Sequence, residues 1–176
     1  MTAATTIDPQ LMRTCMSQFA SGVTVVTGID EAGNPLGFAC QSFASLSLDP
    51  ALILICVDHG GRSWPQIAPS GKFSVNVLAE EQGDLVSRFG SSRGQRFEGL
   101  DWHESPLGTP ALPDTLLRVD CEVHEVLPGG DHDIVVGRVQ ELALGEPNAP
   151  MLFFRGKIGI RKEIRVESHT LGWGWE

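Results

Sequence analysis

The sequence predicts a mainly β protein, a Greek-key-type antiparallel β-barrel with short helices. Its 176 residues include 20 Gly and 11 Pro, and so many turn formers favour numerous short strands over a helical bundle. Six or seven segments show the apolar patterns that are typical of strands. These segments do not form the strand–helix–strand repeats that build a Rossmann fold. We expect a single domain over residues 1–176, with a core of about 10–160 and a C-terminal tail at 161–176.

The first third of the chain predicts a helix followed by strands. Asp8-Pro9 marks a helix start, because Asp caps free N–H groups and Pro suits the first turn. The apolar spacing that follows is helical and ends before Gly22, and its members are Leu11, Met12, Cys15, Met16, Phe19 and Ala20. The β-branched run GVTVVTGI predicts a strand, and DEAGNP predicts a hairpin tip after it. The continuous apolar run 51–57 predicts a strand that is buried on both faces.

The remainder alternates between turns, strands and one more helix. The segment DHGGRSWPQIAPSG predicts a loop with one helical turn, and PGGDH predicts a hairpin between two long strands. The expected elements are strands at 72–78, 116–127, 133–144 and 151–160 and an amphipathic helix at 80–89. Residues 90–113 show no periodicity, and irregular segments of this length inside a compact domain are usually functional.

Composition and charge exclude several classes of partner. The net charge of −9 offers no basic stripe for phosphate backbones or anionic lipids, so neither nucleic acid nor a membrane is an expected partner. The four cysteines form no CxxC pair, which predicts buried free thiols in a reducing, cytoplasmic compartment. The N-terminus lacks the pattern of a signal peptide, and the longest apolar run is too short to span a bilayer.

Two short motifs are weak indications of catalysis. Residues 90–94 match GxSxG, but a predicted helix precedes the Ser where a nucleophile elbow needs a strand, so we do not expect a hydrolase. Asp58-His59 and Asp131-His132-Asp133 carry metal-ligand types, yet they lie in Gly-rich turns where solvated polar residues are usual. We therefore expect no metal site.

The uncharged stretch GFACQSFASLS, residues 37–47, needs a different explanation. It is too polar for an ordinary buried strand and too apolar for a solvated loop, and its small side chains let another group approach the backbone closely. Arg62-Ser63 follows Gly60-Gly61, which predicts a phosphate cradle made of N–H groups and a guanidinium, with a plain surface turn as the alternative. Together these turns predict a ligand site at the ends of the strands.

The order of several blocks along the chain resembles the flavin reductase-like family. The blocks are GVTVVT, GFACQSFASLSLDPALILICV, RSW, GKFSVNVL, RFGS, FEGLDW, GGDH and LFFRG, and they cover about residues 10–157. The resemblance implies an FMN-binding split barrel and the activity of a short NAD(P)H:flavin oxidoreductase. Such proteins are reductase components of two-component flavin-dependent monooxygenases. GFACQSFASLSL with RSW most resembles the reductases that partner phenol and secosteroid-phenol hydroxylases.

The resemblance also implies a set of site residues. The flavin, FMN or FAD, would be wrapped by Pro35, Leu36, Gly37, Phe38, Ala39, Cys40, Gln41 and Ser42, with Ser47 nearby. Its other side would be lined by Cys56, Val57 and Asp58, its phosphate held by Arg62 and Ser63, and its ring capped by Phe97. The nicotinamide would lie by His132, the expected catalytic residue, and by Phe154, Arg155 and Gly156. The family further implies NADH as co-substrate, with NADPH as the alternative, a separate monooxygenase as partner, and a homodimer.

The chemistry of hydride transfer agrees with this resemblance. Nicotinamide C4 must stack near flavin N5, so one ring face must stay open, and no side chain need act as acid or base. Two other split-barrel functions compete with a reductase. A non-enzymatic flavin- or haem-binding protein would not need the GGDH turn, and a pyridoxamine-phosphate-oxidase-like enzyme would want a basic phosphate cluster that the sequence does not show.

Overall fold

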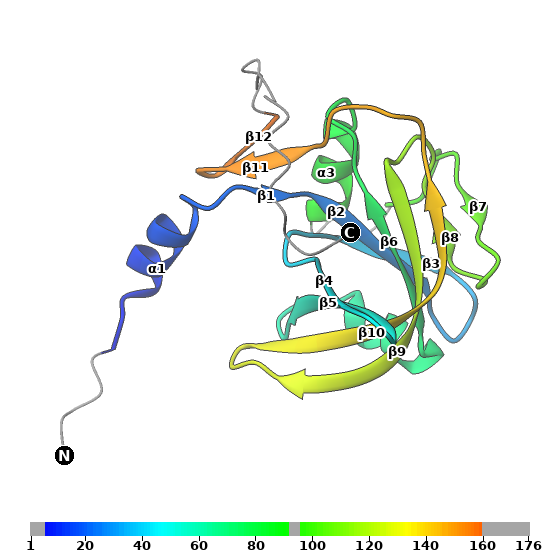
Figure 1. The fold of residues 1–176 in the computed structure, drawn as a ribbon, viewed down its shortest axis with the longest axis horizontal. Coiled ribbons are helices and arrows are strands. Elements are labelled where there is room, and N and C mark those ends of the chain that lie inside the picture. The colour runs from blue at the N-terminus through cyan, green and yellow to red at the C-terminus, as the bar shows by residue number, and fades with distance from the viewer. Residues whose placement is uncertain (1–5, 92–95, 160–176) are drawn as a thin grey trace.

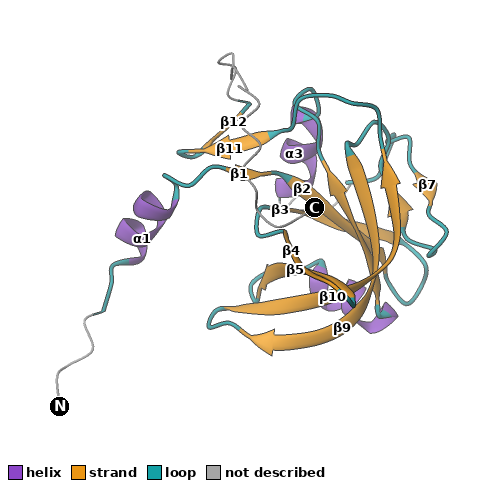
Figure 2. Ribbon diagram, in the orientation of Figure 1, coloured by secondary structure: helices purple, strands orange, loops and turns teal. Residues whose placement is uncertain are grey.

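A computed structural model describes residues 6–91 and 96–159, and its centre is a curled antiparallel sheet (Figures 1 and 2). The seven strands run in the order β3-β2-β6-β9-β10-β5-β4. Their bounds are β2 Thr24–Ile29, β3 Pro35–Cys40, β4 Ala44–Leu48, β5 Ala51–Asp58, β6 Lys72–Val77, β9 Leu117–Pro128 and β10 His132–Leu144. The two edge strands, β3 and β4, are consecutive in the chain, so the bend between them brings the edges together as a barrel. The predicted mainly β, antiparallel barrel is confirmed.

Shorter elements surround the barrel. The helices are α1 Pro9–Met16, α2 Trp64–Ile67 and α3 Gly83–Gly90, with a 3-10 turn at Ala68–Ser70. The remaining strands are β1 Ser21–Gly22, β7 His103–Glu104, β8 Pro110–Ala111, β11 Leu152–Phe154 and β12 Lys157–Ile158. The irregular segment 90–113 therefore contains a small β7–β8 hairpin. In the part of the chain that the structure describes, no helix is both long and apolar enough to cross a bilayer.

Strand β2 separates two hydrophobic clusters. Val26 points into the barrel, where Phe73, Ile55 and Val135 are also buried. Val25, one residue earlier, points to the other side and packs in a cluster that includes Phe89 of α3. Because side chains alternate along a strand, β2 is buried on both faces.

The prediction that residues 51–57 are buried on both faces is wrong. In β5 the inward side chains Ile53, Ile55 and Val57 are buried, whereas Leu52 and Leu54 on the outer face are only half-buried. The reason is tertiary: α3 covers the outer face of β2, and no described element covers that of β5.

The N-terminal helix forms as predicted but ends sooner. The Asp8 side chain accepts hydrogen bonds from the N–H groups of Gln10 and Leu11 at 3.3 and 3.2 Å. After Met16 the chain tightens into a turn, and α1 has no buried residue. Figure 1 shows α1 standing away from the barrel. Cys15 is consequently exposed, which corrects the expectation that every thiol is buried.

The predicted last strand, 151–160, is a hairpin within its described part. Arg155 and Gly156 both have positive φ, 51° and 76°, and reverse the chain between β11 and β12. Positive φ at both central residues is the signature of the tight turns that match the twist of paired strands. The apolar pattern LFF predicted the first strand, and the Arg-Gly pair was the overlooked turn signal.

Candidate functional site

A cleft of about 500 Å³ lies at the seam of the barrel, where the bend after β3 meets the ends of β5, α2 and α3. It brings together most of the residues that the family resemblance pointed to. These are Phe38, Ala39, Cys40, Gln41, Ser42, Cys56, Val57, Asp58, Arg62, Ser63 and His132. Gly61 of the predicted phosphate cradle also lines the cleft, although its N–H donates to the carbonyl of Asp58 at 2.9 Å. Trp64, Phe89, Gly90 and Arg96 complete the lining, and the sequence reasoning had not named these four as site residues.

The bend after β3 forms one wall of the cleft. The side chain of Ser42 holds this bend to β5 with two hydrogen bonds, where no backbone pairing between described strands does so. Ser42 Oγ donates to the carbonyl of Cys56 at 3.0 Å and accepts from its N–H at 2.9 Å. Phe38 and Phe43, on either side of the bend, pack against the barrel core. Gln41 lies between them with an exposed side chain, so its amide is available to a polar ligand.

The thiol of Cys40 belongs to the same wall. Burial raises the pKa of Cys40, and a contact of 3.3 Å with Ser42 Oγ only partly opposes that rise. A neutral, buried thiol is a poor nucleophile. Cys40 is therefore a small wall residue that leaves room for a ligand.

Two arginines and a serine form one end of the cleft. The Ser63 hydroxyl is buried and donates to the carbonyl of Gly37 at 3.2 Å. Arg96 Nη1 donates to Ser63 Oγ at 2.6 Å and to the carbonyl of Gly37, and Arg62 lies close enough to act on Arg96 electrostatically. The sequence reasoning missed Arg96 because it lies in the aperiodic segment. The one indication near Arg96 in the sequence was its neighbour Phe97, which the family resemblance implied would cap the flavin ring.

Phe97 itself does not line the cleft. Its ring packs edge-on against Phe89 at 5.2 Å and Trp102 at 5.7 Å, in the cluster outside the barrel. Its direct contact with a flavin stays a prediction, whereas its packing anchors the segment that carries Arg96.

Among the histidine and aspartate side chains of the two adjoining turns, His132 and Asp58 line the cleft. His132, at the start of β10, pairs across the sheet with Asp58, and its Nδ1 lies 2.7 Å from Asp131 Oδ1. That hydrogen bond lowers the pKa of Asp131. His59 Nε2 lies 3.0 Å from Asp133 Oδ1. Within 6–91 and 96–159, no group of three such side chains is arranged to hold a metal ion.

Several predicted site residues lie elsewhere. Pro35 and Leu36 pair with the end of β2, Ser47 pairs with Leu52, and Gly37 reaches the site only through its carbonyl. Phe154, Arg155 and Gly156 form the β11–β12 turn, where Arg155 Nε donates to Gln18 Oε1 at 2.9 Å. Their role toward a nicotinamide stays a prediction.

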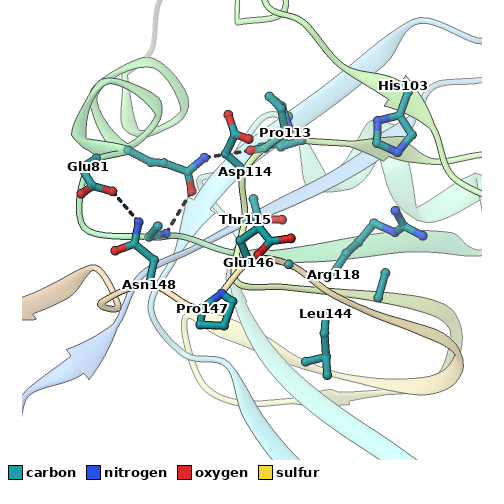
Figure 3. Close-up of a pocket in the computed structure, with 15 residues that line it drawn as sticks. Glu81, His103, Pro113, Asp114, Thr115, Arg118, Leu144, Glu146, Pro147 and Asn148 are labelled. Carbon is teal, nitrogen blue, oxygen red and sulfur yellow. Dashed lines mark hydrogen bonds between the residues drawn. The ribbon is translucent and has the colours of Figure 1, made fainter.

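A larger cleft, of about 740 Å³, is less suited to an anionic ligand (Figure 3). Its lining includes the carboxylates of Glu81, Asp114 and Glu146. Arg118, the only arginine among the described residues of its lining, already contacts Asp120 at 3.1 Å and Glu141 at 3.5 Å. Since its cation is neutralised and acidic groups surround it, this cleft would repel phosphate.

The protein is a split barrel, and its seam carries small, polar residues and a cationic end. This combination is typical of the class of flavin-binding oxidoreductases. The model described as the flavin reductase like domain matches residues 16–160, so the chain belongs to the flavin reductase-like family. The predicted family and its oxidoreductase activity are confirmed.

Relatives and solved structures agree with that assignment. The chain is 51% identical over 165 residues to the flavin-dependent monooxygenase reductase subunit HsaB of Rhodococcus jostii, covering 93% of this chain and 84% of that protein. It is 40% identical to a flavin reductase of Pseudomonas putida, with 87% and 90% covered. Nitrilotriacetate monooxygenase component B of Mycobacterium thermoresistibile superposes with a TM-score of 0.86, at 45% identity and 94% coverage of both chains. An NADH:FAD oxidoreductase of Streptomyces globisporus, solved with NAD and FAD fragments, superposes with a TM-score of 0.83, at 29% identity over 92% and 99%.

Proposed function

We propose that this chain oxidises NADH, reduces FMN or FAD, and releases the reduced flavin to a separate flavin-dependent monooxygenase. The observation that carries the proposal is the seam cleft, which combines the small residues of the β3 bend with a cationic end and a histidine at the mouth. The relatives support the partner, because one of them is named as the reductase subunit of a flavin-dependent monooxygenase and another as component B of nitrilotriacetate monooxygenase.

The cleft fits a flavin in shape and in charge. A buried Nε on Arg96 has no hydrogen-bond partner, and the small residues Ala39, Cys40 and Ser42 leave the backbone accessible. When bound, the flavin supplies the redox chemistry by accepting hydride from the nicotinamide. Gln41 and nearby backbone groups would hold its polar edge, while Arg62 and Arg96 would hold its phosphate.

His132 is suited to orient the nicotinamide at the open mouth. Its Nδ1 is held by Asp131, and its Nε2 has no hydrogen-bond partner among the described residues. One ring nitrogen is thus available to a polar group of the incoming nucleotide. NADH is favoured over NADPH, because a solved relative is named an NADH:FAD oxidoreductase and the chain carries a net charge of −9.

The same proposal includes a homodimer in the cytoplasm. Residues that lie opposite each other on neighbouring strands share a face, and Leu54, Ile134 and Leu127 all lie on the outer face of β5, β10 and β9. All three are apolar and at most partly buried. A second copy that covered this face would bury the outer side of β5. The continuous apolar run 51–57 predicts a strand that is buried on both faces in this way.

The proposal also places the protein in the cytoplasm. The four free thiols favour a reducing compartment.

Steady-state assays with purified protein test the proposal. NADH oxidation should require added FMN or FAD, and the reduced flavin should support hydroxylation by a separately purified flavin-dependent monooxygenase. Tight flavin binding without NADH oxidation would show instead a non-enzymatic flavin-binding protein. Absence of both would overturn the proposal.

A further inference from the structure

The imidazole of His132 is held by the carboxylate of the residue before it. Its Nδ1 lies 2.7 Å from Asp131 Oδ1, and an ionised carboxylate can only accept a hydrogen bond. This hydrogen bond lowers the pKa of Asp131, so the carboxylate is ionised near neutral pH. The shared hydrogen therefore belongs to Nδ1 of the histidine, which fixes the tautomer of the ring.

The second ring nitrogen of His132 is left for a ligand. His132 lines the cleft with its side chain 42% exposed, and Nε2 has no hydrogen-bond partner among residues 6–91 and 96–159. In a neutral imidazole whose Nδ1 carries the hydrogen, Nε2 has a lone pair and acts as an acceptor. Without a partner at Nδ1, the hydrogen could occupy either nitrogen, and Nε2 could be a donor instead.

The other charged groups of the two adjoining turns have partners of their own. His59 Nε2 lies 3.0 Å from Asp133 Oδ1, so the second histidine has a separate carboxylate. Asp58, opposite His132 in the sheet, accepts the N–H of Gly60 at 2.7 Å. Among the described residues, Asp131 alone is hydrogen-bonded to the side chain of His132. Asp131 thus sets which kind of hydrogen bond Nε2 can make.

We propose that Asp131 is a positioning residue that makes His132 Nε2 the acceptor for a carboxamide N–H of the nicotinamide. The carboxamide is the polar substituent of the nicotinamide ring, and its nitrogen carries hydrogens that need acceptors. A histidine of fixed tautomer prefers this amide to a substituent that offers only an oxygen. The inference rests on the proposed NADH oxidation, and it adds which group of the nucleotide is recognised and which residue sets that recognition.

Two analogues of NADH separate the amide hydrogens from the oxygen. The reduced acetylpyridine analogue has a methyl ketone in place of the amide, so it keeps the oxygen and loses the N–H donors. The reduced thionicotinamide analogue keeps the N–H donors and has sulfur in place of the oxygen. The value of kcat/KM is measured for each nucleotide with saturating flavin at about pH 8, where an imidazole is ordinarily neutral. Ratios are compared between variants, because the analogues differ in intrinsic reactivity.

Asp131→Ala should lower the preference for NADH over the acetylpyridine analogue by about threefold to tenfold, the range for one hydrogen bond. The preference for the thionicotinamide analogue over the acetylpyridine analogue should fall in the same way. Asp131→Asn should keep most of both preferences, since its side-chain oxygen can still accept from Nδ1. The change should appear in the Michaelis constant for the nucleotide, while that for flavin stays as in the wild type.

Asp133→Ala is the matched control, because it removes a carboxylate next to His132 that contacts His59 instead. It should leave both preferences as in the wild type. Asp131→Ala should fold, since the Asp131 side chain is 93% exposed and its carbonyl still accepts the N–H of His59 at 3.1 Å. Unchanged ratios in Asp131→Ala, or the same change in Asp133→Ala, would overturn the positioning role. A wild type that oxidises no NADH in the presence of FMN or FAD would overturn the proposed function instead.

Discussion

The hydroxyl of Ser42 both donates to the carbonyl of Cys56 and accepts from its N–H, at 3.0 and 2.9 Å. This two-way contact fastens the bend after β3 to β5 at the seam of the barrel. A single side chain thus does what a pair of backbone groups does elsewhere in the sheet, and it leaves the neighbouring backbone of residues 39–41 at the cleft wall.

Replacing this hydroxyl should loosen the cleft wall. Ser42→Ala leaves the Cys56 N–H and carbonyl without these bonds, which should cost about 1–3 kcal/mol in the free energy of unfolding. Urea denaturation measures that cost, and flavin titration should show weaker binding. Ser45→Ala, at an exposed position on β4, should change stability by less than about 0.5 kcal/mol. Equal effects of the two substitutions would contradict the role of Ser42.

Gly37 is required by close packing behind the same wall. A Cβ at Gly37 would lie 2.9 Å from both Phe89 Cε1 and the carbonyl oxygen of Val26. Gly37→Ala should therefore destabilise the protein by about 1–3 kcal/mol and weaken flavin binding. Gly83→Ala, with no atom within 4 Å of the new Cβ, is the control, and thermal unfolding compares the two. A neutral Gly37→Ala would show that α3 moves freely relative to β3.

His132 should act on the nicotinamide more than on the flavin. His132→Ala should raise the Michaelis constant for NADH more than that for flavin, because its side chain lies at the mouth of the cleft. His59→Ala is the control, since His59 contacts Asp133 and does not line the cleft. Initial-rate kinetics with each substrate varied in turn measure both constants. A larger effect on the flavin constant would show that the turn serves the flavin.

Alkaline pH should destabilise the protein through Cys121. Burial, together with the nearby Asp120, raises the pKa of Cys121 from 9.0 to about 12. Above pH 9 the Cys121 thiol loses its proton in the unfolded chain but keeps it in the folded chain. Deprotonation therefore favours the unfolded state, and the free energy of unfolding falls progressively as pH rises from about 9 towards 12. The chain has no Tyr, so fewer other groups titrate in that window.

Denaturation from pH 8 to 10.5 measures this effect. Cys121→Ala should be less stable at pH 8 because of the cavity, but its free energy of unfolding should fall less steeply with pH than that of the wild type. Cys15→Ala, which removes an exposed thiol, should leave the wild-type slope unchanged. Parallel slopes for Cys121→Ala and the wild type would contradict the raised pKa.

The outer face of β5, β10 and β9 should control association. Leu127→Asp places a charge on the apolar outer face, so it should shift the proposed homodimer towards monomer at micromolar concentration. Leu144→Asp, at an 87% exposed position at the far end of β10, is the control. Light scattering after gel filtration gives the mass of each variant. A dimeric Leu127→Asp would place the interface elsewhere, with the exposed face of α1 as the next surface to test.

Local patterns in the sequence determined most of the elements and the class of protein. The Asp8 cap, the β-branched run of β2 and the hairpin between β9 and β10 depend on neighbouring residues, so they could be predicted without the fold. The order of small blocks such as GFACQSFASLS then indicated the family and most of the lining of the cleft.

Only the tertiary structure decided which surfaces are covered and which distant residues meet. Two apolar strands of similar pattern, β2 and β5, differ in burial because α3 packs on one and no described element packs on the other. Arg96 joins the cleft through a contact with Gly37, 59 residues earlier in the chain, from a segment without periodicity. Hydrogen bonds across such separations depend on the path of the whole chain, and no local spacing in the sequence records them.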